Sequence, residues 1–82
     1  MEKNLGYQGY LKVKDRLKAE VIKEGGYRLL RATVLGFVGD ELVESGTDAK
    51  KVHEKTKAEA KKRGKQESDI FITPLNDEIY EV

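Results

Sequence analysis

The side chains of this 82-residue chain that could bind a ligand gather between residues 48 and 65, where lysine recurs at short intervals. This segment holds eight Lys and Arg against three Asp and Glu, a net charge of +5. Ammonium groups along one helix can neutralise the phosphates of a nucleic acid. The phosphate-binding candidates are Lys50, Lys51, Lys57, Lys61 and Lys62.

Residue types that support catalysis or metal binding are scarce. The chain has no cysteine, so its one histidine, His53, cannot complete a zinc site of ordinary composition. Ser45, Ser68 and Asp69 form no recognisable nucleophilic triad with His53. The acidic residues also lack the spacing of a calcium loop. We therefore predict a protein that is not an enzyme and that uses no metal or cofactor.

Apolar side chains suggest a different class of function. The apolar surface of the predicted sheet is larger than one helix with an inner stripe of small residues can cover. Contiguous exposed apolar patches usually mark interaction sites, and a symmetric homodimer is the commonest way to bury them. The predicted interaction face consists of Ile22, Leu29, Leu35, Phe37, Leu42 and Phe71. We expect a protein-interaction module that self-associates through its sheet, or else a nucleic-acid-binding domain that uses residues 48–65.

The elements that must position these residues begin with the stretch from Leu17 to Ser45. Two turn signals, Gly25-Gly26 and Gly39-Asp40, divide this stretch into three apolar segments, which predicts a three-stranded meander. Pairing about the first turn sets Leu17 against Val34 and gives one wholly apolar face. A further strand is expected near residues 11–13.

A helical interpretation of residues 10–24 competes with these strands. Tyr10, Val13, Leu17 and Val21 also recur at helical spacing, and Lys, Arg, Ala and Glu favour helices. In that case Gly25 would end the helix. The hairpin register favours strands, while the alternative stays open.

The second half of the chain predicts one long helix and a last strand. Thr47 or Asp48 would cap the helix, which would run to about Arg63 and stop at Gly64. Its inner stripe would be Ala49, Val52, Thr56 and Ala60. The apolar segment 70–72 would be the last strand, ended by a proline. The predicted fold is one α+β domain over residues 1–82, with a mostly antiparallel sheet of four to five strands and one long helix.

The run from Thr33 to Asp48 resembles the hairpin of a family of small prokaryotic ββαβ domains of unknown function, and the resemblance continues to residue 75. The matching positions are Gly39, Asp40, Ser45, Gly46, Asp48 and Pro74. The resemblance implies two strands, a charged helix and a final strand. It implies no activity, cofactor or partner.

The ends and the overall composition complete the expectations. Residues 1–9 are expected to fray, and the acidic segment 76–82 to be either mobile or a short extra element. No apolar run approaches the roughly 20 residues that span a bilayer, so we expect a cytoplasmic protein without membrane contact. Charged residues make up 38% of the chain, a composition found in thermophiles and also on ordinary solvated surfaces.

Overall fold

The structure, a computed structural model, describes residues 5–75, in which two helices and a short 3-10 helix accompany a three-stranded sheet. In chain order the elements are α1 (Leu5–Ala32), β1 (Val34–Val38), β2 (Glu41–Gly46), α2 (Ala49–Lys62), η1 (Glu67–Asp69) and β3 (Ile70–Pro74). The interpretations of residues 1–4 and 76–82 lie outside the described residues. Residues 5–9, which the sequence predicts to fray, belong to α1.

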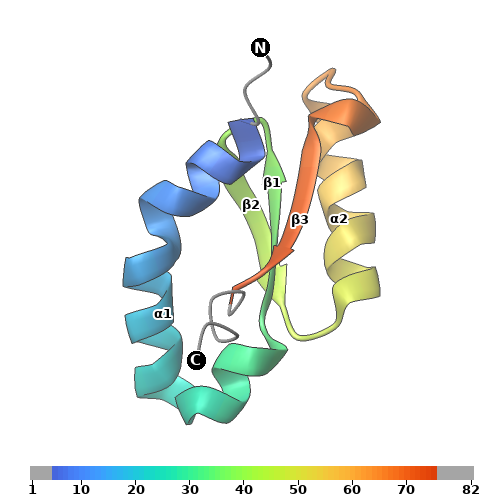
Figure 1. Cartoon of the computed structure of the whole chain (residues 1–82). Helices are drawn as coiled ribbons and strands as arrows, with labels where there is room; N and C mark the ends of the chain where they lie inside the picture. Colours follow the sequence, from blue (N-terminus) through green and yellow to red (C-terminus); the bar gives the residue numbers. More distant parts are fainter. Residues whose placement is uncertain (1–4, 76–82) are drawn as a thin grey trace.

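The sheet has the order β2-β1-β3, and β1 pairs antiparallel with both neighbours. Figure 1 shows α1 and α2 on opposite sides of this sheet, so the fold has three layers. Side chains alternate along β1, which directs Leu35 and Phe37 towards α1 and leaves Gly36 facing α2. The main buried cluster lies on the α1 side and consists of Tyr10, Leu30, Leu35, Phe37 and Leu75.

The prediction of four to five strands with one helix is wrong. Residues 5–32 form α1, so the helical alternative for residues 10–24 is the correct one. The predicted pairing of Leu17 with Val34 has no room in the structure, because β2 and β3 occupy both edges of β1. Residues 11–24, which are mostly good helix formers, instead make their backbone hydrogen bonds within the helix.

A kink divides α1 into two helical segments. Gly26 has φ 73° and ψ −168°, a left-handed conformation that favours glycine, and it does what the sequence prediction assigned to Gly25. The second segment ends where the Thr33 hydroxyl donates to the Leu29 carbonyl oxygen at 2.7 Å. The kink turns buried Leu30 towards the sheet. One chain segment thereby covers a whole face of the sheet.

A buried hydrogen bond fastens α1 to the end of β3. The Tyr10 hydroxyl donates to the carbonyl oxygen of Leu75 at 3.1 Å, and both residues are almost fully buried. The Leu75 amide donates in turn to the Thr33 carbonyl oxygen at 3.0 Å. These two bonds hold the last described residue between α1 and the start of β1.

The ends of α2 follow the capping pattern in the sequence. The Asp48 side chain accepts from the amides of Lys50 and Lys51 at 3.1 and 3.3 Å. After the last turn Gly64 adopts φ 71°, and the Lys65 amide donates to the Ala60 carbonyl oxygen at 2.8 Å. The predicted inner stripe is buried except at its first residue, Ala49, which is exposed.

Gly36 lets α2 lie close to the sheet. A Cβ at this position would overlap the Thr56 hydroxyl oxygen. Thr56 is fully buried, and its hydroxyl donates to the Val52 carbonyl oxygen at 2.6 Å. The β1–β2 register also shifts between Gly36 and Phe37, as at a β-bulge. A glycine inside a strand commonly marks a bulge or a close approach by another element, and Gly36 lies at both.

Replacing Gly36 by Ala should destabilise the fold by about 1–3 kcal/mol, because the added methyl group overpacks the contact with α2. The cost of Gly36→Ala should be smaller in a Thr56→Ala background, where the hydroxyl oxygen is gone. Urea unfolding of the single and double variants measures this difference. Ser45→Ala, at an exposed position of β2, is the control and should change stability by less than about 0.5 kcal/mol. Equal costs of Gly36→Ala in both backgrounds would contradict the proposed contact.

Candidate functional site

The exposed half of α2 carries lysines along two flanks. At 100° per residue, Lys50, Lys57 and Lys61 lie on one flank. Lys51, Lys55 and Lys62 lie on the other flank. The side chains of Glu54 and Ala58 lie between them on the outermost line of the helix.

Two ion pairs show which edge of the sheet each flank faces. Lys55 pairs with Glu44 of β2, with 3.5 Å between Nζ and Oε2. Lys57 pairs with Glu67 of η1 at 3.3 Å, just before β3. Because β2 and β3 are opposite edges of the sheet, the two flanks face opposite sides of the molecule.

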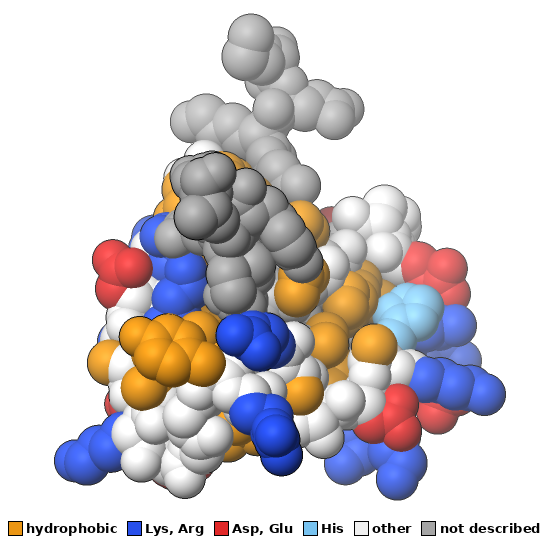
Figure 2. Space-filling view, turned by 60° about the horizontal axis from the view of Figure 1, so that its bottom comes forward, with side chains coloured by type: hydrophobic (Ala, Val, Ile, Leu, Met, Phe, Trp, Pro, Cys, Tyr) orange, Lys and Arg blue, Asp and Glu red, His pale blue; other side chains and the backbone are white. Residues whose placement is uncertain are grey.

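Four of the five phosphate-binding candidates have no acidic partner among residues 5–75. These four are Lys50, Lys51, Lys61 and Lys62, and all four are exposed. Figure 2 shows Lys and Arg side chains around the pale-blue histidine on the α2 side of the molecule, with acidic side chains among them. The structure thus brings the predicted lysines together on one helix, with Lys57 alone of the five engaged by a carboxylate.

Arg63 is a cation that the fold itself uses. Its guanidinium group donates to both carboxylate oxygens of Glu41, at 2.8 and 3.3 Å, and to Glu59 at 2.9 Å. The contact with Glu41 ties the end of α2 to the start of β2. Bidentate pairing of this kind is the strong form of an Arg–carboxylate contact. Sequence alone does not distinguish Arg63 from the neighbouring lysines that remain unpaired.

The same contact shifts the proton affinities of both groups. Hydrogen bonds from Arg63 and its charge lower the pKa of Glu41 below its usual range. The bonds to Glu41 and Glu59 raise the pKa of Arg63 further above its usual value. The lowered pKa of Glu41 means that this pair stabilises the fold above the ordinary carboxyl pKa. The stabilisation is lost as the pH falls through the lowered pKa.

Two further charged residues lie beside α2 and are absent from the predicted site. Lys65 and Glu67 line a hollow between the end of α2 and the start of β3, together with Lys57 and Lys61. The only sequence signal for this hollow is the glycine stop at Gly64, which turns the chain back towards β3. The partner of Lys57 was not foreseeable from local patterns.

The predicted interaction face lies between α1 and the sheet. Leu35 and Phe37 are 1% and 0% exposed. The partly buried side chains of Ile22, Leu42 and Phe71 pack against the same cluster. Leu29 is half-buried beside the kink of α1. Five of these six side chains therefore pack together within one chain, between α1 and the sheet.

The residues considered for catalysis are dispersed. His53 is exposed on α2, and Ser45 and Ser68 are exposed on other elements. The Asp69 carboxylate accepts from the Gln66 amide at 3.0 Å and so caps η1. In the part of the chain that the structure describes, no three acidic or histidine side chains converge as ligands of a metal ion.

No family model, curated protein or solved structure matches this chain. Residues 34–74 run in the order strand, strand, helix, strand that the resemblance to the ββαβ family implies. Membership of that family stays a prediction. Neither helix within residues 5–75 has the length and apolar character needed to cross a bilayer.

Replacing Arg63 by Gln should return the pKa of Glu41 towards its usual range, because the guanidinium group holds that carboxylate charged. The side-chain carboxyl chemical shift of Glu41, followed by NMR from neutral to acidic pH, measures the change. Lys62→Gln is the control and should leave the titration of Glu41 unaltered, since Lys62 has no acidic partner among the described residues. An unchanged Glu41 pKa in Arg63→Gln would contradict the contact.

Proposed function

We propose that the chain is a non-catalytic DNA-binding module that places α2 in the major groove of a duplex. The observation that carries the proposal is the arrangement of unpaired lysines on two flanks of one exposed helix. In the major groove, which is about 12 Å wide and admits an α-helix, each flank would face one phosphate backbone. A cytoplasmic location, where DNA lies in a prokaryotic cell, is part of this proposal.

The dimensions and the outer line of α2 support this arrangement. Its 14 residues make a helix about 21 Å long. The outermost side chains, Glu54 and Ala58, would approach the base edges. A carboxylate can accept a hydrogen bond from cytosine, and a methyl group can contact thymine. Phosphate contacts would dominate the affinity, and these two residues would add a modest sequence preference.

The proposal distinguishes DNA from RNA duplexes. The major groove of an A-form RNA helix is deep and narrow, so side chains do not read it. The module should therefore bind duplex DNA more tightly than duplex RNA of the same sequence. Equal affinity for both would indicate contact with phosphates alone.

Replacing lysines of one flank should lower the affinity for duplex DNA and should also make that affinity less dependent on salt concentration. Lys50→Gln with Lys61→Gln should lower the salt slope by about two units, because each phosphate contact contributes about 0.9. Fluorescence anisotropy of a labelled duplex at several salt concentrations measures the slope. The control pair is Arg16→Gln with Lys23→Gln, which removes the same charge from the exposed surface of α1. No binding at low salt, or an equal loss in the control pair, would contradict the proposal.

A second candidate function, association of two copies, is favoured by exposed apolar side chains on α1. Leu5, Tyr7 and Leu11 are 53%, 45% and 41% exposed, and all lie in the first two turns of the helix. Because α1 covers the sheet face first expected to associate, the contact is proposed on α1 instead. Burial of these three side chains would contribute the usual hydrophobic stabilisation.

Light scattering over micromolar concentrations tests this second candidate. The wild-type chain should show a mass that rises towards twice the monomer, and Leu11→Lys should keep it monomeric. Lysine is a good helix former, so this substitution removes apolar surface without disturbing α1. A wild-type chain that stays monomeric throughout would eliminate association.

A further inference from the structure

The hollow between α2 and η1 is small and partly apolar. It has a volume of about 320 Å³ and is lined by Lys57, Ala58, Ala60, Lys61, Lys65, Glu67 and Ile70. This volume lies at the lower end of the range of ligand pockets, about 300–1,000 Å³. Its apolar floor contains Ala60, which is buried, and Ile70, which is half-buried. Its rim is charged.

Backbone hydrogen bonds fix the walls of the hollow. The Lys65 amide donates to the Ala60 carbonyl oxygen at 2.8 Å, which holds the turn after α2 in place. The amides of Gln66 and Asp69 donate to the Asp69 carboxylate and the Gln66 carbonyl oxygen, at 3.0 and 2.9 Å. These bonds position η1 and with it Glu67. The hollow is therefore formed before any ligand enters.

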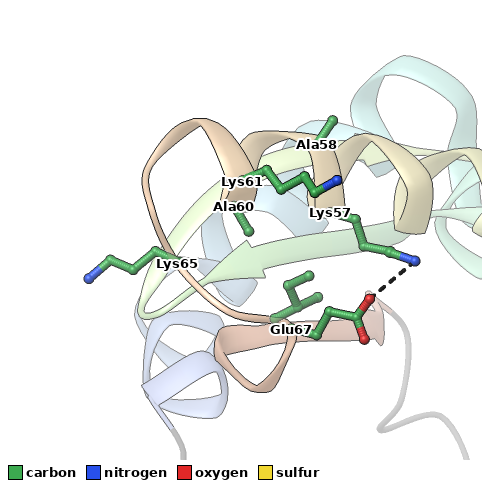
Figure 3. A pocket seen from close by; sticks show the side chains of 7 residues that line it. Lys57, Ala58, Ala60, Lys61, Lys65 and Glu67 are labelled. Atoms are coloured by element: carbon green, nitrogen blue, oxygen red, sulfur yellow. Dashed lines mark ion pairs between the residues drawn. The ribbon is translucent and has the colours of Figure 1, made fainter.

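Two of the lysines that line the hollow, Lys57 and Lys61, are one helical turn apart on α2. Figure 3 shows Lys57 and Lys61 extending to the same side, whereas Lys65 extends away in the opposite direction. The Lys57 ammonium group pairs with the Glu67 carboxylate at 3.3 Å. Lys61 has no acidic partner among the described residues. One of these two lysines is thus already paired with a carboxylate of the chain.

We propose that this hollow binds a phosphomonoester group carried on a small apolar body. A phosphomonoester bears a charge of about −1.5 to −2 at neutral pH and can accept from two ammonium groups at once. Lysine binds phosphate as a point charge, without the planar fork that makes arginine suited to carboxylates. The organic part of the ligand would cover Ala60 and Ile70. The site adds a ligand class to the proposed DNA-binding function and does not depend on it.

Glu67 acts in this proposal as a competitor built into the chain. It holds Lys57 when the hollow is empty and must release that lysine when the phosphate group enters. Its charge also repels the entering dianion. The Glu67 side chain is 78% exposed, so it can turn into solvent at little cost. Removing its charge should therefore strengthen binding, while removing a lysine should weaken it.

The test follows the backbone amides of the folded chain by two-dimensional NMR during titration with phenyl phosphate, inorganic phosphate and phenol. Phenyl phosphate should shift the amides around Ala60, Ile70 and residues 64–67, and should bind more tightly than either of its two parts. Glu67→Gln should tighten the binding of phenyl phosphate about two- to fivefold, and Lys61→Gln should weaken it by a similar factor. Lys51→Gln, on the opposite flank of α2, is the control and should leave it unchanged.

Three results would overturn the proposal: no shift around the hollow, weaker or unchanged binding in Glu67→Gln, or an equal loss in Lys51→Gln. Duplex DNA binding by the wild-type chain, measured beside phenyl phosphate binding, separates the two proposals. A wild-type chain that binds duplex DNA but not phenyl phosphate would refute this site alone. Phenyl phosphate binding without DNA binding would refute the proposed DNA-binding function alone.

Discussion

The burial of one five-residue strand holds the three layers together. β1 pairs with a strand on each edge and carries a helix on each face, so all other elements pack around it. The side chains of β1 are large on the face towards α1 and absent at the point where α2 lies closest. Leu35 and Phe37 fill the space beneath α1, whereas Gly36 leaves room for Thr56 of α2. A large side chain at residue 36 would push α2 away from the sheet. Small side chains at residues 35 and 37 would remove the apolar contacts that α1 makes with β1.

Local signals in the sequence predict α2 well and α1 poorly. Asp48 and Gly64 mark the ends of α2 because capping depends on neighbouring residues only. Residues 10–24 satisfy a helical and a strand period together, and what decides between them is remote. β3, almost 50 residues further on, takes the edge of β1 that a hairpin strand would need. Because the sequence predicts strands where α1 lies, it does not predict that a helix buries Phe37.

The candidate site shows the same division between local and remote information. The lysines of α2 and their spacing follow from the sequence. Which of them are neutralised depends on acidic residues from other elements, Glu44 for Lys55 and Glu67 for Lys57. Arg63 looks like one more basic residue at the end of a helix until Glu41 is placed beside it. The hollow needs the return of the chain through η1, which no periodic pattern indicates.

The single-residue connection between α1 and β1 is where two copies of this chain could exchange α1. Thr33 alone separates the helix from the strand. The contacts of α1 with the rest of the described residues include packing, the Lys12–Asp40 ion pair and the Tyr10–Leu75 hydrogen bond. All of these contacts would be reproduced if α1 of one molecule docked on the sheet of another. In such an exchange α1 would take the place of a partner subunit, and Thr33 would be the hinge.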